Sequence, residues 1–453
     1  MKFYDREAQL QYLKKIVNSP HKELVYIAWR RRIGKTTLVK HALKSKKFAY
    51  FFVGKIYKNE LLKRFAQQLS QLIDLPLQID SFYDFFKMLF KFSHQFDAIV
   101  FDEFQNFLRV DKSIYSYIQQ LFDETDQPIK LILTGSHYTI LKEIFEKYTN
   151  PLYGRKTGQI FLKPFDFTTQ LQILKDHSTA PVKPIDFLTF YGIYWWIPYY
   201  QAFLADRILP HIKTNLKNHL IKAFFDSENI FLTEGKDILL IEFGDKHPTY
   251  FAILAAIAAW NHTRWEIASY IGMNPDSLGV YLHDLVDFFD LLEQQRSIMS
   301  SPNSKKVRYI IKDGFLKFWF RYVYRYQHLI ELNQLQDLIK FVQKDINTFL
   351  GYKFEDLIKE YLIKYNGNNP LCPFKFTQIW TYFDGKREID LVCLEPKQRL
   401  AGFLELKLTY YKNKSQLLQQ LQTKANEISK FKNFKKHFAT LNLREFWKII
   451  NLS

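Results

Sequence analysis

The chain has very little cysteine: only Cys372 and Cys393 occur among its 453 residues. Neither belongs to a Cys-x-x-Cys pair or to a Cys/His cluster, which excludes a disulfide framework and a zinc site of the usual ligand spacing. We therefore expect both to be buried, reduced thiols. Internal repeats, Gly/Ser-rich linkers and low-complexity stretches are also missing, so we expect closely packed domains.

Long apolar runs are absent as well. The first residues lack the apolar core of a signal peptide, and the longest apolar stretch lies around residues 250–260. A helix needs roughly 20 apolar residues to cross a bilayer. We expect a cytoplasmic protein without a membrane partner.

Acidic residues are outnumbered. Asp and Glu number 46 against 64 Lys and Arg, which gives a formal net charge of +18 and a pI near 9.4. Such a balance favours a polyanionic partner, nucleic acid and in particular DNA, with an anionic membrane surface as the weaker alternative. At about 150 residues per domain, the length is enough for about three domains.

A phosphate-binding loop is the clearest motif. The apolar run 24–28 leads into Gly34, Lys35 and Thr36, and then directly into a helical pattern. In such a loop backbone N–H groups surround phosphate oxygens, the lysine neutralises the outer phosphates, and the hydroxyl holds Mg²⁺. The first glycine of the usual pattern is replaced by Trp29, at a cost of about 1–2 kcal/mol if the backbone there is left-handed. An ordinary strand-to-helix turn is the alternative, which this context disfavours.

A second apolar run, residues 96–103, ends in Asp102 and Glu103. Helices and strands alternate between the two runs, which predicts a parallel sheet with helices on both faces. At the end of a neighbouring strand, Asp102 would position the water shell of Mg²⁺ and Glu103 would polarise the attacking water.

Two further segments carry groups that suit the same site. The run 130–136 ends in hydroxyls, so Thr134 or Ser136 either senses the γ-phosphate or the attacking water, or is purely structural. The turn-rich segment 150–157 contains Arg155. This arginine is either a finger on the transferred phosphoryl group, in cis or from a neighbouring subunit of a homo-oligomer, or a surface residue.

Together these segments resemble the archaeal-type P-loop ATPases, which are grouped with the AAA+ and STAND switch ATPases. The segments that carry the resemblance are Asp5-Arg6-Glu7, Arg30-Arg-Arg-Ile-Gly-Lys-Thr-Thr37, Val100-Phe-Asp-Glu-Phe-Gln105, Leu133-Thr-Gly-Ser136 and Leu152-Tyr-Gly-Arg155. The resemblance implies ATP and Mg²⁺ as cofactors and a helical lid with a Gly-x-Pro turn beside the nucleotide. It implies a nucleotide contact for the following residues: Asp5, Arg6, Arg32, Ile33, Gly34, Lys35, Thr36, Thr37, Ser136 and Pro198.

In this chain the lid turn reads Trp196-Ile197-Pro198, so a tryptophan again replaces a glycine. Together with Trp29, this departure motivates an alternative to an active ATPase. The alternative is a slow or lapsed ATPase in a non-cleaving regulatory switch that binds nucleic acid.

The family plan continues through the chain. It implies an ATPase core at 1–165, a helical lid at 166–247, a winged helix at 248–312, a helical connector at 313–345 and a nuclease-like domain at 346–453.

The winged-helix segment is also visible in its residues. Thr263-x-x-Glu266 predicts a capping box, and Asn274-Pro275 predicts a helix start. A hairpin with Lys305, Lys306 and Arg308 would form a basic wing for DNA phosphates. Since the expected recognition helix has acids and no Lys or Arg, we favour an intramolecular module that relays the nucleotide state.

The final domain contains Asp390 and, fifteen residues later, Glu405-x-Lys407. On a strand, Glu405 and Lys407 point to one face, so with Asp390 on the adjacent strand they can hold Mg²⁺ or Mn²⁺ beside an ammonium group. The pattern resembles the PD-(D/E)xK nucleases, in an α/β restriction-endonuclease-like fold. The resemblance implies Asp390 and Glu405 as metal ligands, Lys407 as the catalytic lysine and Glu355 as the acid of the first helix. An exposed salt pair is the alternative.

Residues after this strand could add to such a site. Gln419 or Gln420 could supplement it, and a run of lysines is either a phosphate-tracking flank or a solvated helix face. The lysines are Lys424, Lys430, Lys432, Lys435 and Lys436. We therefore predict an ATP-hydrolysing switch that binds DNA and carries a metal-dependent nuclease-type domain.

Overall fold

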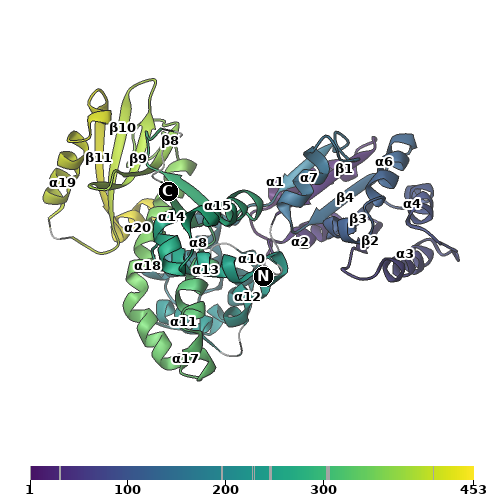
Figure 1. Cartoon of the computed structure of the whole chain (residues 1–453), viewed down its shortest axis with the longest axis horizontal. Helices are drawn as coiled ribbons and strands as arrows, with labels where there is room; N and C mark the ends of the chain where they lie inside the picture. Colours follow the sequence, from purple (N-terminus) through teal and green to yellow (C-terminus); the bar gives the residue numbers. More distant parts are fainter. Residues whose placement is uncertain are drawn as a thin grey trace. The chain divides into compact units, whose positions relative to one another are not determined.

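The computed structural model describes residues 2–29, 32–194, 197–226, 228, 230–243, 247–301, 307–411 and 413–452. The chain forms two compact units, one of Met1–Pro164 with Ile197–Tyr199 and one of Phe165–Trp196 with Tyr200–Ser453 (Figure 1). In the described part of the chain, no helix is both long and apolar enough to cross a membrane.

The first unit is built on a five-stranded parallel sheet with the order β2-β3-β4-β1-β5. The strands are β1 (Glu23–Ala28), β2 (Phe48–Phe52), β3 (Ala98–Asp102), β4 (Lys130–Gly135) and β5 (Gly158–Phe161). The main helices are α1 (Glu7–Val17), α2 (Lys35–Ala42), α3 (Lys58–Ile73), α4 (Phe82–Lys91), α6 (Ile114–Glu124) and α7 (Tyr138–Glu146). The predicted α/β core with a parallel sheet is confirmed.

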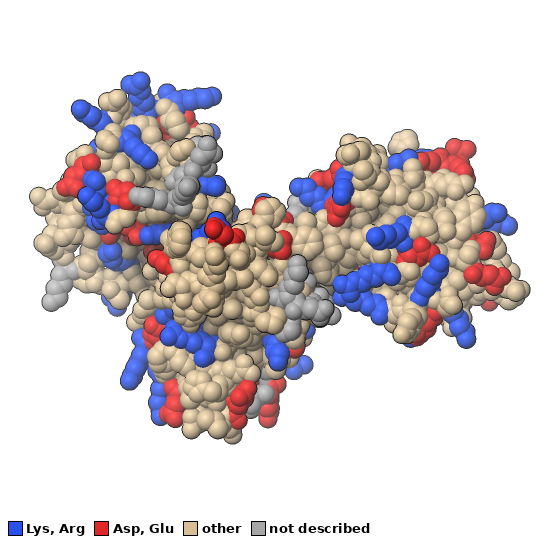
Figure 2. Space-filling model, viewed as in Figure 1, with Lys and Arg blue, Asp and Glu red and all other residues tan. Residues whose placement is uncertain are grey.

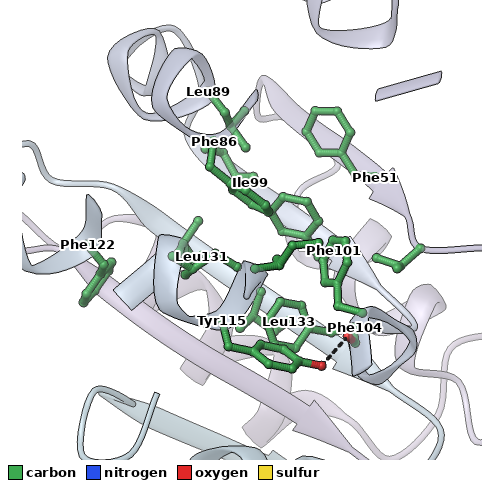
Figure 3. Close-up of a cluster of buried hydrophobic side chains, with 14 of the residues drawn as sticks. Phe51, Phe86, Leu89, Ile99, Phe101, Phe104, Tyr115, Phe122, Leu131 and Leu133 are labelled. Atoms are coloured by element: carbon green, nitrogen blue, oxygen red, sulfur yellow. Dashed lines mark hydrogen bonds between the residues drawn. The ribbon is translucent and has the colours of Figure 1, made fainter. Parts of the chain in front are cut away.

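The sheet has two cores because its central strands are apolar on both faces. In β4, Leu131 and Leu133 face one core while Ile132 faces the other, as the period of two of a strand requires. The first core lies under α3, α4, α6 and α7 and is rich in aromatic rings, including Phe51 and Phe101, which stack with centroids 5.3 Å apart (Figure 3). The second core lies under α1 and α2.

The second unit begins with the helices of the expected lid, which are α8 (Phe167–His177), α9 (Pro184–Tyr194), α10 (Pro198–Arg207, whose first two residues belong to the first unit), α11 (Leu216–Phe224) and α12 (Phe231–Phe243). Three helices and a hairpin follow: α13 (His247–Ala258), α14 (Arg264–Ile271), α15 (Pro275–His283), β6 (Leu292–Arg296) and β7 (Val307–Ile311). The capping box of Thr263 and Glu266 and the Asn274 cap are both present. These two predictions of helix starts are confirmed.

The connector consists of α16 (Gly314–Phe318), a π-helical turn (Trp319–Tyr324), α17 (Gln327–Glu331) and the start of α18 (Leu335–Lys364). The expected boundary between residues 345 and 346 falls inside α18, which runs for 30 residues. The helix continues because its buried residues, such as Val342, Ile346, Phe349 and Leu350, keep helical spacing across that point.

The final domain has a four-stranded sheet with the order β11-β10-β9-β8. Its strands are β8 (Gln378–Phe383), β9 (Glu388–Glu395), β10 (Leu400–Lys407) and β11 (Lys435–Asn442), and α19 (Lys414–Asn426) connects β10 to its parallel neighbour β11. The chain ends with α20 (Leu443–Leu452). The helix-face alternative for the lysine run is wrong at Lys435 and Lys436, since these residues begin β11 and pair with β10. Cys372 and Cys393 are buried and free, as predicted.

Candidate functional sites

The phosphate-binding loop connects β1 to α2. Gly34 precedes the helix with a φ of 96°, a conformation that favours glycine, and Lys35 is the first helical residue. The Lys35 ammonium group donates a hydrogen bond of 2.8 Å to the carbonyl oxygen of Trp29. Trp29 itself has a φ of 159°, close to extended, so the left-handed strain considered for this position does not arise. The first turn of α2 presents backbone N–H groups and the positive end of a helix dipole, which are the groups that bind an anion at a helix start.

Thr36 lies on the helix that follows β1, and Asp102 ends β3. The two residues meet at the carboxyl end of the sheet although β4 lies between β1 and β3. The Thr36 hydroxyl donates to one oxygen of Asp102 over 2.9 Å, and the Tyr50 hydroxyl donates to the same oxygen over 2.5 Å. Thr134 donates to the other oxygen. A hydroxyl and a carboxylate in contact are the oxygen donors that Mg²⁺ takes from a protein beside nucleotide phosphates and water. These residues therefore fit the ion that the loop implies.

Glu103 is held by its neighbours. Its φ of 58° is left-handed, and its carboxylate accepts hydrogen bonds from Ser136 Oγ (2.7 Å) and from Gln105 Nε2 (2.5 Å). Both donors lie 3.3 Å from His137 Nδ1. Burial lowers the pKa of His137 to about 4, so its ring is neutral at pH 7. Glu103 thus lies at the site, but its carboxylate is engaged with protein groups.

The other residues that were predicted to contact the nucleotide differ from one another in burial and in their neighbours. Ile33 is buried and Thr37 is exposed on the first turn of α2. The Arg32 guanidinium lies 4.8 Å from the ring centre of Tyr199, the residue after Pro198, so the loop and the Pro198 segment are neighbours within the first unit. Trp196 lies outside the described residues.

The Asp5-Arg6-Glu7 box is partly structural. Arg6 is buried, and its Nη2 donates to the carbonyl oxygen of Lys163 over 2.7 Å. Asp5 is exposed, with a left-handed φ of 46°. Burial lowers the pKa of Arg6, yet the side chain remains a cation because the ordinary pKa of arginine is so high.

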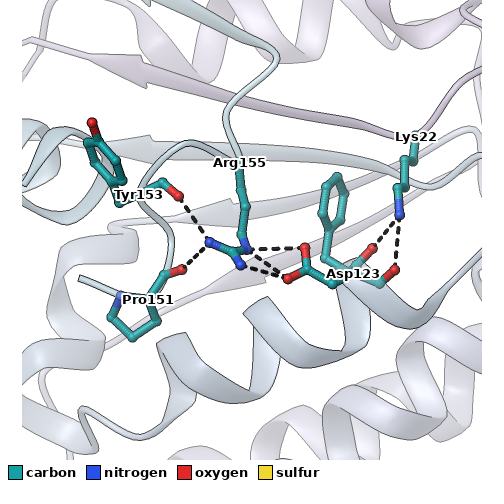
Figure 4. Close-up of polar contacts among 6 residues, drawn as sticks. Lys22, Asp123, Pro151, Tyr153 and Arg155 are labelled. Atoms are coloured by element: carbon teal, nitrogen blue, oxygen red, sulfur yellow. Dashed lines mark hydrogen bonds and ion pairs between the residues drawn. The ribbon is translucent and has the colours of Figure 1, made fainter. Parts of the chain in front are cut away.

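Arg155 does not reach the nucleotide site of its own chain. It binds both carboxylate oxygens of Asp123 (closest contact 2.7 Å) and the carbonyl oxygens of Pro151 and Tyr153 (Figure 4). Lys22, which precedes β1, binds the backbone carbonyl of the same Asp123. Arg155 therefore lies at the amino end of the parallel sheet, about 20 Å from the carboxyl end at roughly 3.3 Å per residue of β1. The interpretation as an arginine finger in cis is wrong.

The second candidate site is an acidic cluster on the four-stranded sheet. The last pair of the antiparallel β9–β10 ladder is Leu391 with Leu404. Asp390 and Glu405 are the next residues beyond this pair on the two strands, so they lie side by side. Asp390 accepts a hydrogen bond from the Leu406 N–H (2.6 Å). Lys407 Nζ lies 2.9 Å from Glu405, as the period of two predicts.

Repulsion between the acids marks this cluster. Burial and the charge of Glu405 raise the pKa of Asp390 to about 6. Burial and the charges of Asp390, Asp356 and Glu388 raise the pKa of Glu355, on α18, well above its ordinary value. A divalent cation would relieve this repulsion, so Asp390 and Glu405 fit Mg²⁺ or Mn²⁺ as a two-carboxylate site that keeps several waters. Among the described residues there is no group of three or more His, Cys, Asp or Glu side chains placed to share one ion.

Lysines and one arginine surround the acids, and Figure 2 shows Lys and Arg side chains gathered on the visible face of this domain. Lys424 Nζ lies 3.3 Å from Glu405. Arg308 of the expected wing forms an ion pair with Glu388. Lys305 and Lys306 lie outside the described residues, so only one of the three wing cations is placed by the structure.

Sequence reasoning missed three contributors: Tyr50, Gln105 and His137. Gln105 is the last residue of the segment 100–105 and His137 directly follows Ser136, so their places in the sequence were a usable signal. Tyr50 gave none, because it reaches Asp102 only through the pairing of β2 with β3.

Comparison with known proteins identifies the first part of the chain. The family model described as an ATPase domain predominantly from Archaea matches residues 3–194. A second model, described as archaeal and bacterial proteins of unknown function, matches residues 319–428, which include the whole acidic cluster.

Two solved structures are similar to this chain in part. The Walker-type ATPase PABY2304 of Pyrococcus abyssi is 20% identical with a TM-score of 0.47, covering 70% of this chain and 96% of that one. The ORC2 protein of Aeropyrum pernix, in ADPNP and ADP complexes, is 13% identical with a TM-score of 0.46, covering 76% and 96%. Because both TM-scores are below 0.5, the family assignment depends on the sequence matches alone.

A curated relative matches nearly the whole chain. An uncharacterized protein of Methanocaldococcus jannaschii is 32% identical over 408 residues, which are 89% of this chain and 87% of the relative. The chain therefore belongs to the same family as this archaeal protein, and its residues 3–194 form an ATPase domain of a predominantly archaeal kind.

Proposed function

We propose that the protein is an ATP-binding switch that binds DNA and cleaves it at the acidic cluster of its C-terminal domain. The observation that carries the cleavage part is the convergence of Asp390, Glu405 and Lys407, with Glu355 close enough for the charge of Asp390 to raise its pKa. Like charges this close are costly unless a cation joins them. The net charge of +18 supports a polyanionic substrate.

At the nucleotide site, Lys35 and the first turn of α2 bind the phosphates of ATP, and Thr36 and Asp102 hold the Mg²⁺ shell. The Mg²⁺ ion, when bound, neutralises charge that develops on the phosphates. Glu103 orients the attacking water once its hydrogen bonds with Ser136 and Gln105 open. Hydrolysis is therefore slow until this clamp is released.

At the acidic cluster, Asp390 and Glu405 would hold Mg²⁺ or Mn²⁺, and the bound ion would activate a water for attack on the phosphorus and stabilise the alkoxide that leaves as the P–O bond breaks. Lys407 binds the phosphate oxygen on which negative charge develops. Glu355 holds the metal's water shell or accepts the proton of the attacking water. Burial and the neighbouring acids raise the pKa of Glu355 well above its ordinary value, so its ionised form is a stronger base than an exposed carboxylate.

The second candidate is the non-cleaving switch with weak ATPase activity. It is favoured by the clamped Glu103 carboxylate and by the replacement of two loop glycines by Trp29 and Trp196. The two candidates agree on ATP and DNA binding, and they differ in cleavage and in the rate of ATP turnover.

One experiment separates them. The purified chain is incubated with supercoiled plasmid and with single-stranded DNA in Mg²⁺ or Mn²⁺, with and without ATP, beside the double variant Glu405→Ala/Lys407→Ala and the variant Lys35→Ala. We expect cleavage that the double variant loses and that responds to ATP only when Lys35 is present. DNA that is bound but never cut would establish the non-cleaving switch instead.

A further inference from the structure

The β6–β7 hairpin is fastened to the edge strand β8 of the four-stranded sheet. The Ile298 N–H donates to the carbonyl oxygen of Thr381 (3.2 Å), and the Phe383 N–H donates to Ser297 Oγ (2.9 Å). Gln295 Nε2 donates to the Thr381 hydroxyl over 3.1 Å. Ile298 is buried in the core of that sheet. The hairpin therefore has a fixed position at the sheet, within the second unit.

Arg308 projects from this hairpin onto the sheet. Its Nη1 and Nη2 donate to the two carboxylate oxygens of Glu388 over 2.8 and 3.2 Å. Its guanidinium carbon lies 4.1 Å from the ring centre of Phe383. Phe383 and Glu388 are direct partners in the β8–β9 ladder, so Arg308 covers one cross-strand pair.

That pair borders the acidic cluster. Glu388 and Asp390 are two residues apart on β9, so their side chains lie on the same face, about 7 Å apart along the strand. Lys407 stands beside Asp390 on the β10 side, and Arg308 stands on the β8 side. The acids thus lie between two cations that come from different parts of the chain.

The geometry of the Arg308–Glu388 pair suits exchange with a phosphate. A guanidinium binds carboxylates and phosphates with the same two parallel hydrogen bonds. The Arg308 side chain is 29% exposed and that of Glu388 is 51% exposed, and ion pairs that solvent reaches are weak. An incoming phosphate can therefore replace Glu388 without disturbing the hairpin, which other contacts hold.

We infer that Arg308 binds a backbone phosphate of the nucleic acid next to the bond that is cleaved, and that Glu388 occupies this guanidinium until the phosphate arrives. The inference rests on the proposed function and adds to it a phosphate contact from the hairpin. The hairpin then serves the cluster as a substrate-binding element with one defined residue.

Arg387 provides a matched control. Like Arg308, it is a partly exposed arginine of the second unit, with 28% of its side chain exposed. Like Arg308, it forms ion pairs with acids, here Asp384 (3.3 Å) and Glu427 (3.4 Å). A loss of charge in general would affect both arginines equally. A phosphate contact at the cluster involves only Arg308.

The test measures binding and cleavage separately in the full chain. Binding of a labelled DNA duplex is titrated in EDTA at several salt concentrations, and plasmid cleavage is followed in Mn²⁺. We expect Arg308→Ala to weaken binding and to reduce the salt slope by about 0.9, the value for one lost phosphate contact. Arg308→Lys keeps most of the slope but cleaves more slowly, and Arg387→Ala changes neither.

The partner variant tests the occupancy by Glu388. We expect Glu388→Gln to tighten binding, and the double variant Arg308→Ala/Glu388→Gln to bind like Arg308→Ala alone. Thermal melts check folding, and if Arg308→Ala is unfolded, Arg308→Lys and Glu388→Gln decide. An unchanged slope in Arg308→Ala, with a wild type that binds and cuts, overturns the inference and leaves the proposed function intact. A wild type that neither binds nor cuts DNA overturns the proposed function as well.

Discussion

The carboxylates of the two candidate sites lie in opposite electrostatic surroundings. Asp102 accepts hydrogen bonds from three neutral hydroxyls, those of Thr36, Tyr50 and Thr134. Asp390, in contrast, lies beside Glu405, whose charge adds to the rise of its pKa. The nucleotide site is thus a satisfied network that a ligand must open, whereas the cluster has concentrated charge that a cation would stabilise.

The largest expected effect is at the cluster. Replacing Asp390 by Asn keeps the shape of the side chain and removes one charge of the two-carboxylate metal site. We expect DNA cleavage to fall by about 10³-fold, since metal-ion catalysis contributes several kcal/mol. Cleavage is measured on plasmid in Mn²⁺, with Glu427→Gln, an exposed acid of the same domain, as control. Equal loss in both variants would mean that charge in general, and not this site, matters.

The next effect concerns the clamp on Glu103. Glu103→Gln removes the group that orients water, and we expect ATP turnover to fall by about 10²-fold. Ser136→Ala removes one donor to Glu103 while leaving Asp102 and its hydroxyls in place, and we expect turnover to rise several-fold. Turnover is measured as phosphate release at saturating ATP. A fall in Ser136→Ala would show that Ser136 acts on the nucleotide and not as a clamp.

A third carboxylate tests whether hydrogen bonds from neutral donors are enough to keep a buried carboxyl group ionised. Glu360 on α18 accepts hydrogen bonds from the Phe167 N–H (2.8 Å) and the Tyr191 hydroxyl (2.9 Å), yet burial raises its pKa to about 7. Because the folded state binds this proton more tightly than the unfolded state, its contribution to stability falls as pH rises from about 4.5 to about 7.

We therefore expect the free energy of unfolding of the wild type to fall, relative to Glu360→Gln, by at most about 3 kcal/mol over this interval. Urea unfolding at pH 5, 6 and 8 measures the difference. A constant difference between the two proteins at all three pH values would contradict the buried, proton-binding state of Glu360.

The smallest effect is expected for Arg155. Its pair with Asp123 is partly exposed, so Arg155→Ala should cost about 1 kcal/mol or less of stability. ATP turnover of the isolated chain should remain within about twofold, because Arg155 lies at the far end of the sheet. If turnover instead depends on protein concentration and collapses in the variant, the arginine acts on a neighbouring subunit.

The sequence predicted local features well and long-range contacts poorly. The capping box at Thr263 and the cap at Asn274 depend on residues only a few positions apart, and the motif at Gly34 includes its own turn and helix. Arg155 lies just before β5, so its place in the fold depends on the parallel pairing of β5 with β1. The assignment of Lys435 and Lys436 to a strand depends on the pairing of β11 with β10. Such pairings involve residues far apart in the chain and leave no local pattern.

The long helix α18 has a mechanical consequence. At about 1.5 Å per residue its 30 residues form a rod of about 45 Å. Asp345 joins this rod to Arg321 of the connector (2.7 Å), and Glu355 lies ten residues, about 15 Å, further along. A tilt of the rod by about 5° at Asp345 would move Glu355 by about 1 Å, the scale at which catalytic geometry fails. Because α18 spans both the connector and the cluster, a small motion of the connector would be passed along the helix to Glu355.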